Sequence, residues 1–359
     1  MKKIGQFFNY FFIGFSFLAD KKIVAILTVC LFITLLDVST GYREEIREME
    51  QEMMGEKTSS EVQYYNDSSI EYESTIKSAA AVEVMKCLSA TVDLESVPST
   101  IQDKVSQLNQ YYNQSSQYFS FLYKDLQTGF TISYNESAPI FTASTIKAPA
   151  MIYLYEQASL GLIDLNEQLV YTGNFYNTGS GVLKNKEVGT SYSVEELIEY
   201  VIHDSDNIAY AMLMNRFSRE NILNFWQGLG TQSIYTLDTI WGVTSAKDAG
   251  IYMQELYRFY LENDLYGTKL MDKFMNAGWK LITNREGEFR TANKGGWAGT
   301  AIHDVAIVFE ENPYILVVMS NMGTGNYQPL FQTTSQLVGE IHEAYWQYKE
   351  NECMKIRQY

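Results

Sequence analysis

The sequence is poor in the side chains that hold metals or build disulfide frameworks. Its 359 residues include three cysteines and three histidines, with no CxxC pair and no HExxH motif. This scarcity argues against a structural zinc site and a disulfide-rich fold, so we expect no metal and no cofactor. Cys30 lies inside an apolar run, which leaves Cys87 and Cys353 as the one pair that could bridge. The sequence leaves that disulfide open, because it depends on an oxidising compartment.

Positive charge is also scarce. Lysine and arginine number 27 against 43 aspartates and glutamates, a formal net charge of −16. A surface this acidic repels the phosphates of nucleic acids and of anionic lipids, so we expect no nucleic-acid partner. Apolar residues make up 46% of the chain, which is ample for a packed core. The acidity is therefore read as a solvated surface.

One apolar run stands out, at residues 23–38, and only Asp37 interrupts it. As a helix it would reach about 24 Å, a short membrane span. Lysines precede the run and glutamates follow it, which predicts a cytoplasmic N-terminus and an extracellular remainder. A cleaved signal peptide is the alternative, but no small-x-small cleavage site follows. We expect a single-pass protein of a bacterial cell membrane, anchored through this helix.

The chain after the run divides by composition. We expect a cytoplasmic or interfacial segment with the anchor at residues 1–39, a stalk at 40–98, a globular domain at 99–350 and a tail at 351–359. Periodicity within the domain predicts strands near both ends and helices between them. This order indicates an α+β fold with helices packed on an antiparallel sheet. The predicted helices are 101–114, 144–159, 193–203, 245–262 and 327–350, and the predicted strands are two joined at 127–129, followed by 300–310 and 314–322.

The tetrapeptide STIK occurs twice, at Ser74–Lys77 and Ser144–Lys147. A serine with a lysine three residues later can form a nucleophile and its base, but so short a pattern also arises by chance. Two further motifs lie downstream, Ser205-Asp206-Asn207 and Lys294-Gly295-Gly296. Ser205 follows Ser144 by 61 residues and Ser74 by 131.

An SxxK motif, an SDN motif about sixty residues later and then a Lys-Gly strand resemble the class A β-lactamases and the related penicillin-binding peptidases. Only Ser144 has this spacing, so we interpret the first STIK as coincidence. The resemblance covers about residues 101–350, and it includes the segment GSGVL at 179–183. It implies a β-lactamase/transpeptidase-like fold. The residues that it implies are Ser144, Lys147, Ser205 and Lys294 for catalysis, and Asn207, Gly296 and Trp297 for substrate binding.

The chemistry requires these residue types. Ser144 becomes nucleophilic when a base removes its proton, and Lys147 lies one helical turn further on. Lysine acts as a base only when neutral, a state that burial and the nearby cation Lys294 would favour. Ser205 would relay a proton to the leaving nitrogen. Backbone N–H groups of Ser144 and Trp297 would form the oxyanion hole.

Two departures from the family pattern affect the expected activity. Gly295 stands where relatives carry Thr or Ser, whose hydroxyl helps to bind the substrate carboxylate. Class A enzymes also carry a glutamate that activates the deacylating water, and residues 221–244 contain no glutamate. Asp238 is the only acid there; it is either an ordinary loop residue or a substitute base. We therefore expect slow deacylation.

Three functions remain open from the sequence. The first is a serine hydrolase that turns over a β-lactam or another small amide or ester. The second is a D-alanyl-peptidase-like enzyme that acylates and deacylates slowly on a peptidoglycan-type amide. The third is a catalytically silent binding or sensor module at the cell surface. All four catalytic side chains are present, which favours an enzyme; the oligomeric state is left open.

Overall fold

The computed structural model describes residues 81–114, 118–235, 241–283, 290–323, 325 and 327–355. The chain divides into two compact units, Met1–Ser89 with Glu350–Tyr359, and Ala90–Lys349. The expected anchor lies outside the described residues, as does the first STIK. Within the described part of the chain, no helix combines the length and apolarity of a membrane span. In the first unit a disulfide joins Cys87, in the helical segment 81–89, to Cys353.

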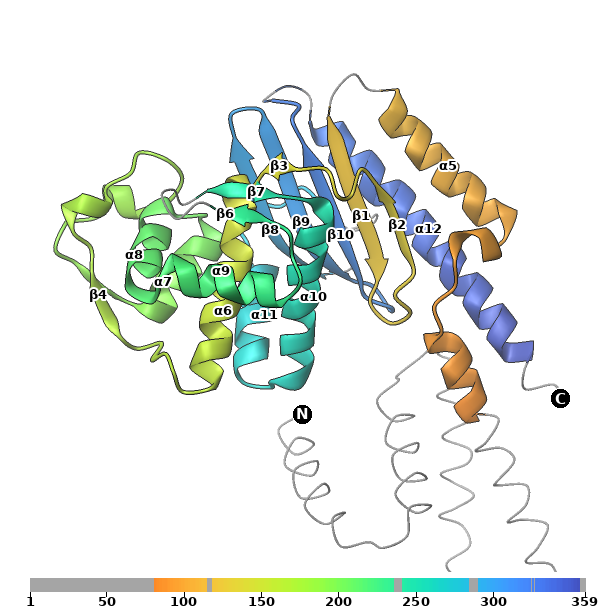
Figure 1. Cartoon of the computed structure of the whole chain (residues 1–359), viewed down its shortest axis with the longest axis horizontal. Coiled ribbons are helices and arrows are strands. Elements are labelled where there is room, and N and C mark those ends of the chain that lie inside the picture. Colours follow the sequence, from red (N-terminus) through yellow and green to blue (C-terminus); the bar gives the residue numbers. More distant parts are fainter. Residues whose placement is uncertain are drawn as a thin grey trace, which may run out of the picture. The chain divides into compact units, whose positions relative to one another are not determined.

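A five-stranded sheet forms the centre of the second unit (Figure 1). Its strand order is β2-β1-β10-β9-β8, and every neighbouring pair is antiparallel. The pairing of β1 with β10 confirms that strands from both ends of the domain share one sheet. The strands are β1 (Phe119–Asp125), β2 (Thr131–Tyr134), β8 (Arg290–Ala298), β9 (Ala301–Phe309) and β10 (Tyr314–Ser320).

Helices cover both faces of this sheet. On one face α10 (Ala246–Glu262) packs against β1, β9 and β10, and α11 (Tyr266–Met275) packs against β8. Helix α6 (Lys147–Ser159) packs behind them against α10 and α11. Strand residues such as Val305 and Val317 share one buried apolar cluster with these helices. This cluster is the core on which the site rests.

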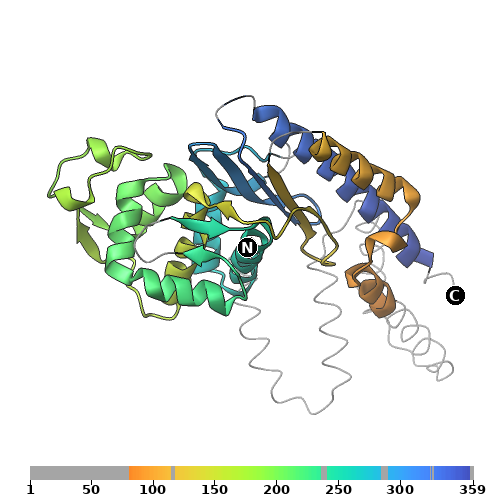
Figure 2. The ribbon, with the colours of Figure 1, turned by 45° about the horizontal axis from the view of Figure 1, so that its top comes forward.

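The other face is covered by α5 (Ser99–Asn113) and α12 (Gln328–Met354), which lie side by side in Figures 1 and 2. Tyr112 of α5 stacks on Phe121 of β1, with ring centroids 4.9 Å apart. Its hydroxyl lies 2.6 Å from Thr334 Oγ1 of α12. The bounds of α12, Gln328–Met354, confirm the helix predicted at 327–350.

A helical region inserted between β2 and β8 completes the unit (Figure 1). The predicted capping box is confirmed, because Glu196 N–H donates to Ser193 Oγ at 3.2 Å and Ser193 N–H to Glu196 Oε2 at 2.7 Å. The remaining elements are η1 (Leu94–Ser96), β3 (Ile140–Phe141), η2 (Ala143–Ile146), β4 (Gln168–Val170), η3 (Gly173–Phe175), η4 (Leu183–Asn185), β5 (Ser191–Ser193), α7 (Val194–His203), α8 (Asn207–Phe217), α9 (Arg219–Gly228), β6 (Ile234–Tyr235) and β7 (Gly242–Thr244).

One predicted helix begins differently. We expected a single helix from Ser144 to Ser159, but Ser144 lies in the 3₁₀ turn η2 and the α-helix begins at Lys147. Pro149 explains the change, because it has no N–H to donate to Thr145 O and its ring crowds that carbonyl. The preceding residues therefore adopt the tighter turn.

Candidate active site

Ser144 lies within η2, and this turn contacts strand β8. Its side chain is 6% exposed. A Cβ added at Gly296 would lie 3.0 Å from Ser144 N and 2.9 Å from Thr145 N, so glycine is what lets β8 pass this close. The first N–H groups of a helix have no acceptor within it. Strand β8 thus passes the Ser144 amide at Gly296, the residue before Trp297; the oxyanion hole formed by the Ser144 and Trp297 amides stays a prediction.

Lys147, the first residue of α6, is fully buried. Its Nζ donates to Ser205 O at 2.5 Å, to Asn207 Oδ1 at 2.7 Å and to Ser205 Oγ at 3.2 Å. Burial lowers the pKa of Lys147 well below its usual value, and the charge of Lys294 lowers it further, while Asp206 opposes the shift. This shift favours the neutral amine, which can act as a base.

Lys294 approaches the same hydroxyl from β8. Its Nζ donates to Ser205 Oγ at 3.0 Å and to Gly295 O at 3.0 Å. Burial lowers the pKa of Lys294 to about 8, and Asp304 opposes this shift. Ser205 Oγ therefore lies between two lysine amines, an arrangement in which a hydroxyl can pass a proton between partners.

A buried carboxylate holds the turn that presents Ser205. The backbone of Ser205 is left-handed, with φ +52°, a conformation that costs energy for a residue with a side chain. A Cβ at Gly181 would fall 2.2 Å from the Asp206 carboxyl carbon, which explains the glycine in GSGVL. The Asp206 carboxylate accepts four backbone N–H bonds, from Val182 at 2.6 Å, Leu183 at 2.8 Å, Ile208 at 2.8 Å and Ala209 at 3.0 Å.

A second buried carboxylate supports the Lys294 side. Asp304 pairs across the strands with Gly295. Its Oδ2 accepts from Leu281 N at 2.7 Å, Ile282 N at 2.8 Å and Asn293 Nδ2 at 2.9 Å. Burial raises the pKa of Asp304 to about 6, so the group is largely ionised at neutral pH and offsets the charge of Lys294.

An indole fills the space beside Gly295. A Cβ added there would lie 2.2 Å from Trp279 Cε3 and 2.5 Å from Cζ3. Trp279 thus occupies the place in which a threonine or serine side chain at 295 would begin. Sequence reasoning noticed the missing hydroxyl but missed the tryptophan, which lies 16 residues earlier in the chain.

Two aromatic rings lie near Lys147, Tyr210 of α8 and Trp241, which directly precedes β7. The ring centroids of Tyr210 and Trp241 each lie 5.8 Å from Lys147 Nζ. Asp238 lies outside the described residues. The next acid along the chain, Asp248, binds Ser233 Oγ at 2.5 Å and the Gln232 N–H at 3.1 Å, so it anchors the α9–β7 connection. Sequence reasoning also missed Trp241.

His303 has a structural role. It is buried, its Nδ1 accepts from Ser320 N at 3.2 Å, and its Nε2 donates to Phe141 O at 2.7 Å. Burial lowers its pKa to about 4, so the ring is neutral. The bond to Phe141 ties β9 to the segment that leads into Ser144.

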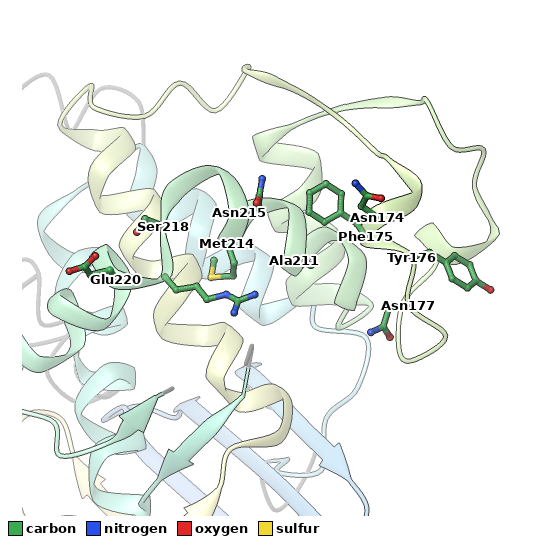
Figure 3. Close-up of a pocket in the computed structure, with 10 residues that line it drawn as sticks. Asn174, Phe175, Tyr176, Asn177, Ala211, Met214, Asn215, Ser218 and Glu220 are labelled. Carbon is green, nitrogen blue, oxygen red and sulfur yellow. The ribbon is translucent and has the colours of Figure 1, made fainter. Parts of the chain in front are cut away.

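An open pocket of about 610 Å³ lies away from Ser144, beside α8 and the start of α9 (Figure 3). Its wall includes Phe175 and Asn177, and Asn177 Oδ1 accepts from Asn207 Nδ2 at 3.3 Å. No candidate catalytic side chain lines it. The hydrogen bond between Asn177 and Asn207 links this pocket to the candidate site.

The family follows from comparison with known proteins. Residues 102–347 match the model of the β-lactamase enzyme family, so the chain belongs to this family. A search of curated proteins finds no match.

Solved structures share the fold at low identity. PBP-A is 19% identical, with a TM-score of 0.63 over 71% of this chain and 98% of its own. A PBP-A point mutant has the same identity, TM-score and coverage, and was solved as an acyl-enzyme with penicillin G. The β-lactamase of Sphaerobacter thermophilus is 20% identical, with a TM-score of 0.57 over 70% of this chain and 97% of its own.

Proposed function

We propose that the protein is a serine hydrolase that forms an acyl-enzyme on Ser144 and releases it slowly. The substrate is a β-lactam or a D-Ala-type peptide amide. The observation that carries this proposal is the pair of buried lysines that meet at Ser205 Oγ, 3.2 Å from Lys147 and 3.0 Å from Lys294. Two buried amines beside one hydroxyl cost free energy of folding, and proton transfer gives a reason to retain them.

The proposed acylation uses only groups of the protein and the substrate to move the proton and to hold the oxyanion. Neutral Lys147 takes the Ser144 proton as Oγ bonds to the substrate carbonyl, and the amides of Ser144 and Trp297 hold the oxyanion. The carbon–nitrogen bond then breaks. The proton passes from Lys147 through Ser205 Oγ to the leaving nitrogen, which yields an ester on Ser144 and a free amine.

Deacylation lacks an evident carboxylate base among the described residues. A water that attacks the ester needs a general base, whose contribution is typically 10²–10⁴-fold. The indole of Trp241, 5.8 Å from Lys147 Nζ, offers no carboxylate. We therefore propose that hydrolysis of the acyl-enzyme is slowed by about this factor relative to class A enzymes.

We also propose that the catalytic domain lies outside the cell, anchored by the apolar run at 23–38. The disulfide between Cys87 and Cys353 supports an extracytoplasmic site, because such bonds persist in oxidising compartments.

A fluorescent penicillin tests the proposed nucleophile. We expect covalent labelling of the wild type, none of Ser144→Ala, and unchanged labelling of Ser74→Ala, the matched control from the other STIK. Labelling that depends on Ser74 would refute the assignment of the nucleophile. A folded wild type that no penicillin labels at any concentration would instead support a catalytically silent module.

A further inference from the structure

The indole of Trp241 extends from a solvent-exposed ring to the buried amine of Lys147. Trp241 is partly exposed, whereas Lys147 is fully buried. The centroid of the indole lies 5.8 Å from Lys147 Nζ. The same indole lies 6.2 Å, between ring centroids, from Phe141, a residue that is 39% exposed. Trp241 is therefore placed between water and the base of the candidate site.

The backbone next to Trp241 is tied to the segment that leads into the nucleophile. Gly242 follows Trp241 directly, and Thr142 lies two residues before Ser144. Thr142 N donates to Gly242 O at 2.9 Å, and Gly242 N donates to Thr142 Oγ1 at 3.1 Å. These two hydrogen bonds hold the chain at Trp241 beside the turn that carries Ser144.

A second ring covers Lys147 from inside the protein. The centroid of Tyr210 also lies 5.8 Å from Lys147 Nζ, and Tyr210 is 3% exposed. The amine itself donates to oxygen atoms of Ser205 and Asn207. Of the two rings, Trp241 is the one that reaches solvent. Truncation of its side chain would therefore open a path for water to the amine.

Water access bears on how long an ester on Ser144 survives. In the proposed acylation, Lys147 is neutral again once its proton has passed through Ser205 to the leaving nitrogen. A neutral amine next to a water molecule can serve as a general base. The lack of a carboxylate would then not be enough to prevent hydrolysis. Exclusion of water from the site protects a reactive intermediate in such a case.

We propose that the indole of Trp241 is a cover that keeps water from Lys147 and from the Ser144 ester, and so prolongs the acyl-enzyme. The cover acts by excluding solvent, and it exchanges no proton with the substrate. This inference rests on the proposed acylation of Ser144. It adds a second cause of slow release to the missing carboxylate, and a nucleophile that needs no base separates the two causes.

Hydroxylamine is such a nucleophile. Its neutral amine attacks the ester carbonyl, a hydroxamate forms, and Ser144 leaves as the free alcohol with the proton of the amine. Full-length protein is acylated with benzylpenicillin, freed of excess and treated with hydroxylamine, and intact mass spectrometry follows the adduct. We expect the wild-type adduct to persist. The Trp241→Ala adduct should be lost at least about tenfold faster, in hydroxylamine and in plain buffer alike.

Two further variants separate a cover from general damage to the fold. Trp241→Phe keeps an aromatic ring and should restore slow release. Tyr176→Ala removes a ring that is 59% exposed at the pocket away from Ser144, and should behave as the wild type does. Thermal unfolding and the rate of acylation are measured for each variant. A cover predicts faster release at an acylation rate close to that of the wild type.

The outcomes distinguish this inference from the proposed function. If hydroxylamine discharges the wild-type adduct as fast as the Trp241→Ala adduct, the cover is overturned while the acyl-enzyme stands. If benzylpenicillin adds no mass at Ser144, the proposed function fails and the inference fails with it. Where Trp241→Ala does not fold, Trp241→Leu takes its place, because leucine is apolar and smaller than the indole.

Discussion

Ser205 receives two lysine side chains at one hydroxyl, and this is the point on which the chemistry depends. Both amines are buried, and burial disfavours their charged forms. A positive charge on one amine further disfavours a positive charge on the other. The cation is favoured at Lys294, because Asp304 attracts it, and the neutral base at Lys147. Motif spacing predicted that these residues meet. The sequence also indicated that Lys147 is the neutral lysine beside the cation Lys294, but it did not indicate that Asp304 stabilises this cation.

This charge balance predicts a pH dependence. Protonated Lys294 donates to Ser205 and keeps Lys147 neutral, so acylation should fall as pH rises through the Lys294 pKa of about 8. Asp304→Asn removes the negative charge that favours protonated Lys294, so that pKa should decrease. The alkaline limb of the acylation rate should then move to lower pH. Rates measured from pH 5 to 10 check this, with the exposed Asp264→Asn as control; an unmoved limb would show that Asp304 does not tune Lys294.

At the scale of elements, the sequence predicted the parts of the fold that have strong local patterns. The strands β1 and β2 on either side of a turn, the apolar strands β9 and β10, and the capping box of α7 were all recognisable. The predicted start of α6 was wrong, because Pro149 disfavours α-helix in the turn before it and the helix begins at Lys147 instead of Ser144. Trp279 had no local signal, since it reaches Gly295 only through the segment that Asp304 clamps after α11.

The contact between β8 and η2 gives a prediction at this scale. Gly296→Ala would place a Cβ 2.9 Å from Thr145 N and 3.0 Å from Ser144 N, against backbone that cannot rotate away. We expect the strand to shift, with a cost of about 1–3 kcal/mol in unfolding free energy and a large loss of acylation. Urea unfolding and penicillin labelling measure the two effects.

Gly228→Ala is the control for this variant, because nothing lies within 4 Å of its added Cβ. Wild-type labelling by Gly296→Ala would mean that the close approach of β8 is not needed for the oxyanion hole.

At the scale of the whole molecule, the chain carries a net charge of −16, and our proposal is that the apolar run at 23–38 anchors it in a membrane. We predict that protease added to intact cells removes the domain and leaves the N-terminus protected. Immunoblots against both ends measure this, and non-reducing gels should show Cys87 paired with Cys353. A domain that resists protease until the cells are lysed would contradict the topology.

The central claim is that Ser144 is acylated and then released slowly, and the lifetime of the adduct tests it most directly. Purified protein is saturated with benzylpenicillin, the excess is removed, and rapid-quench mass spectrometry follows the adduct. A typical enzyme turns over at about 10 s⁻¹, and loss of the general base removes at least about 10² of this. We therefore predict release below about 0.1 s⁻¹, from Ser144 alone. Release at about 10 s⁻¹ or faster would contradict the account.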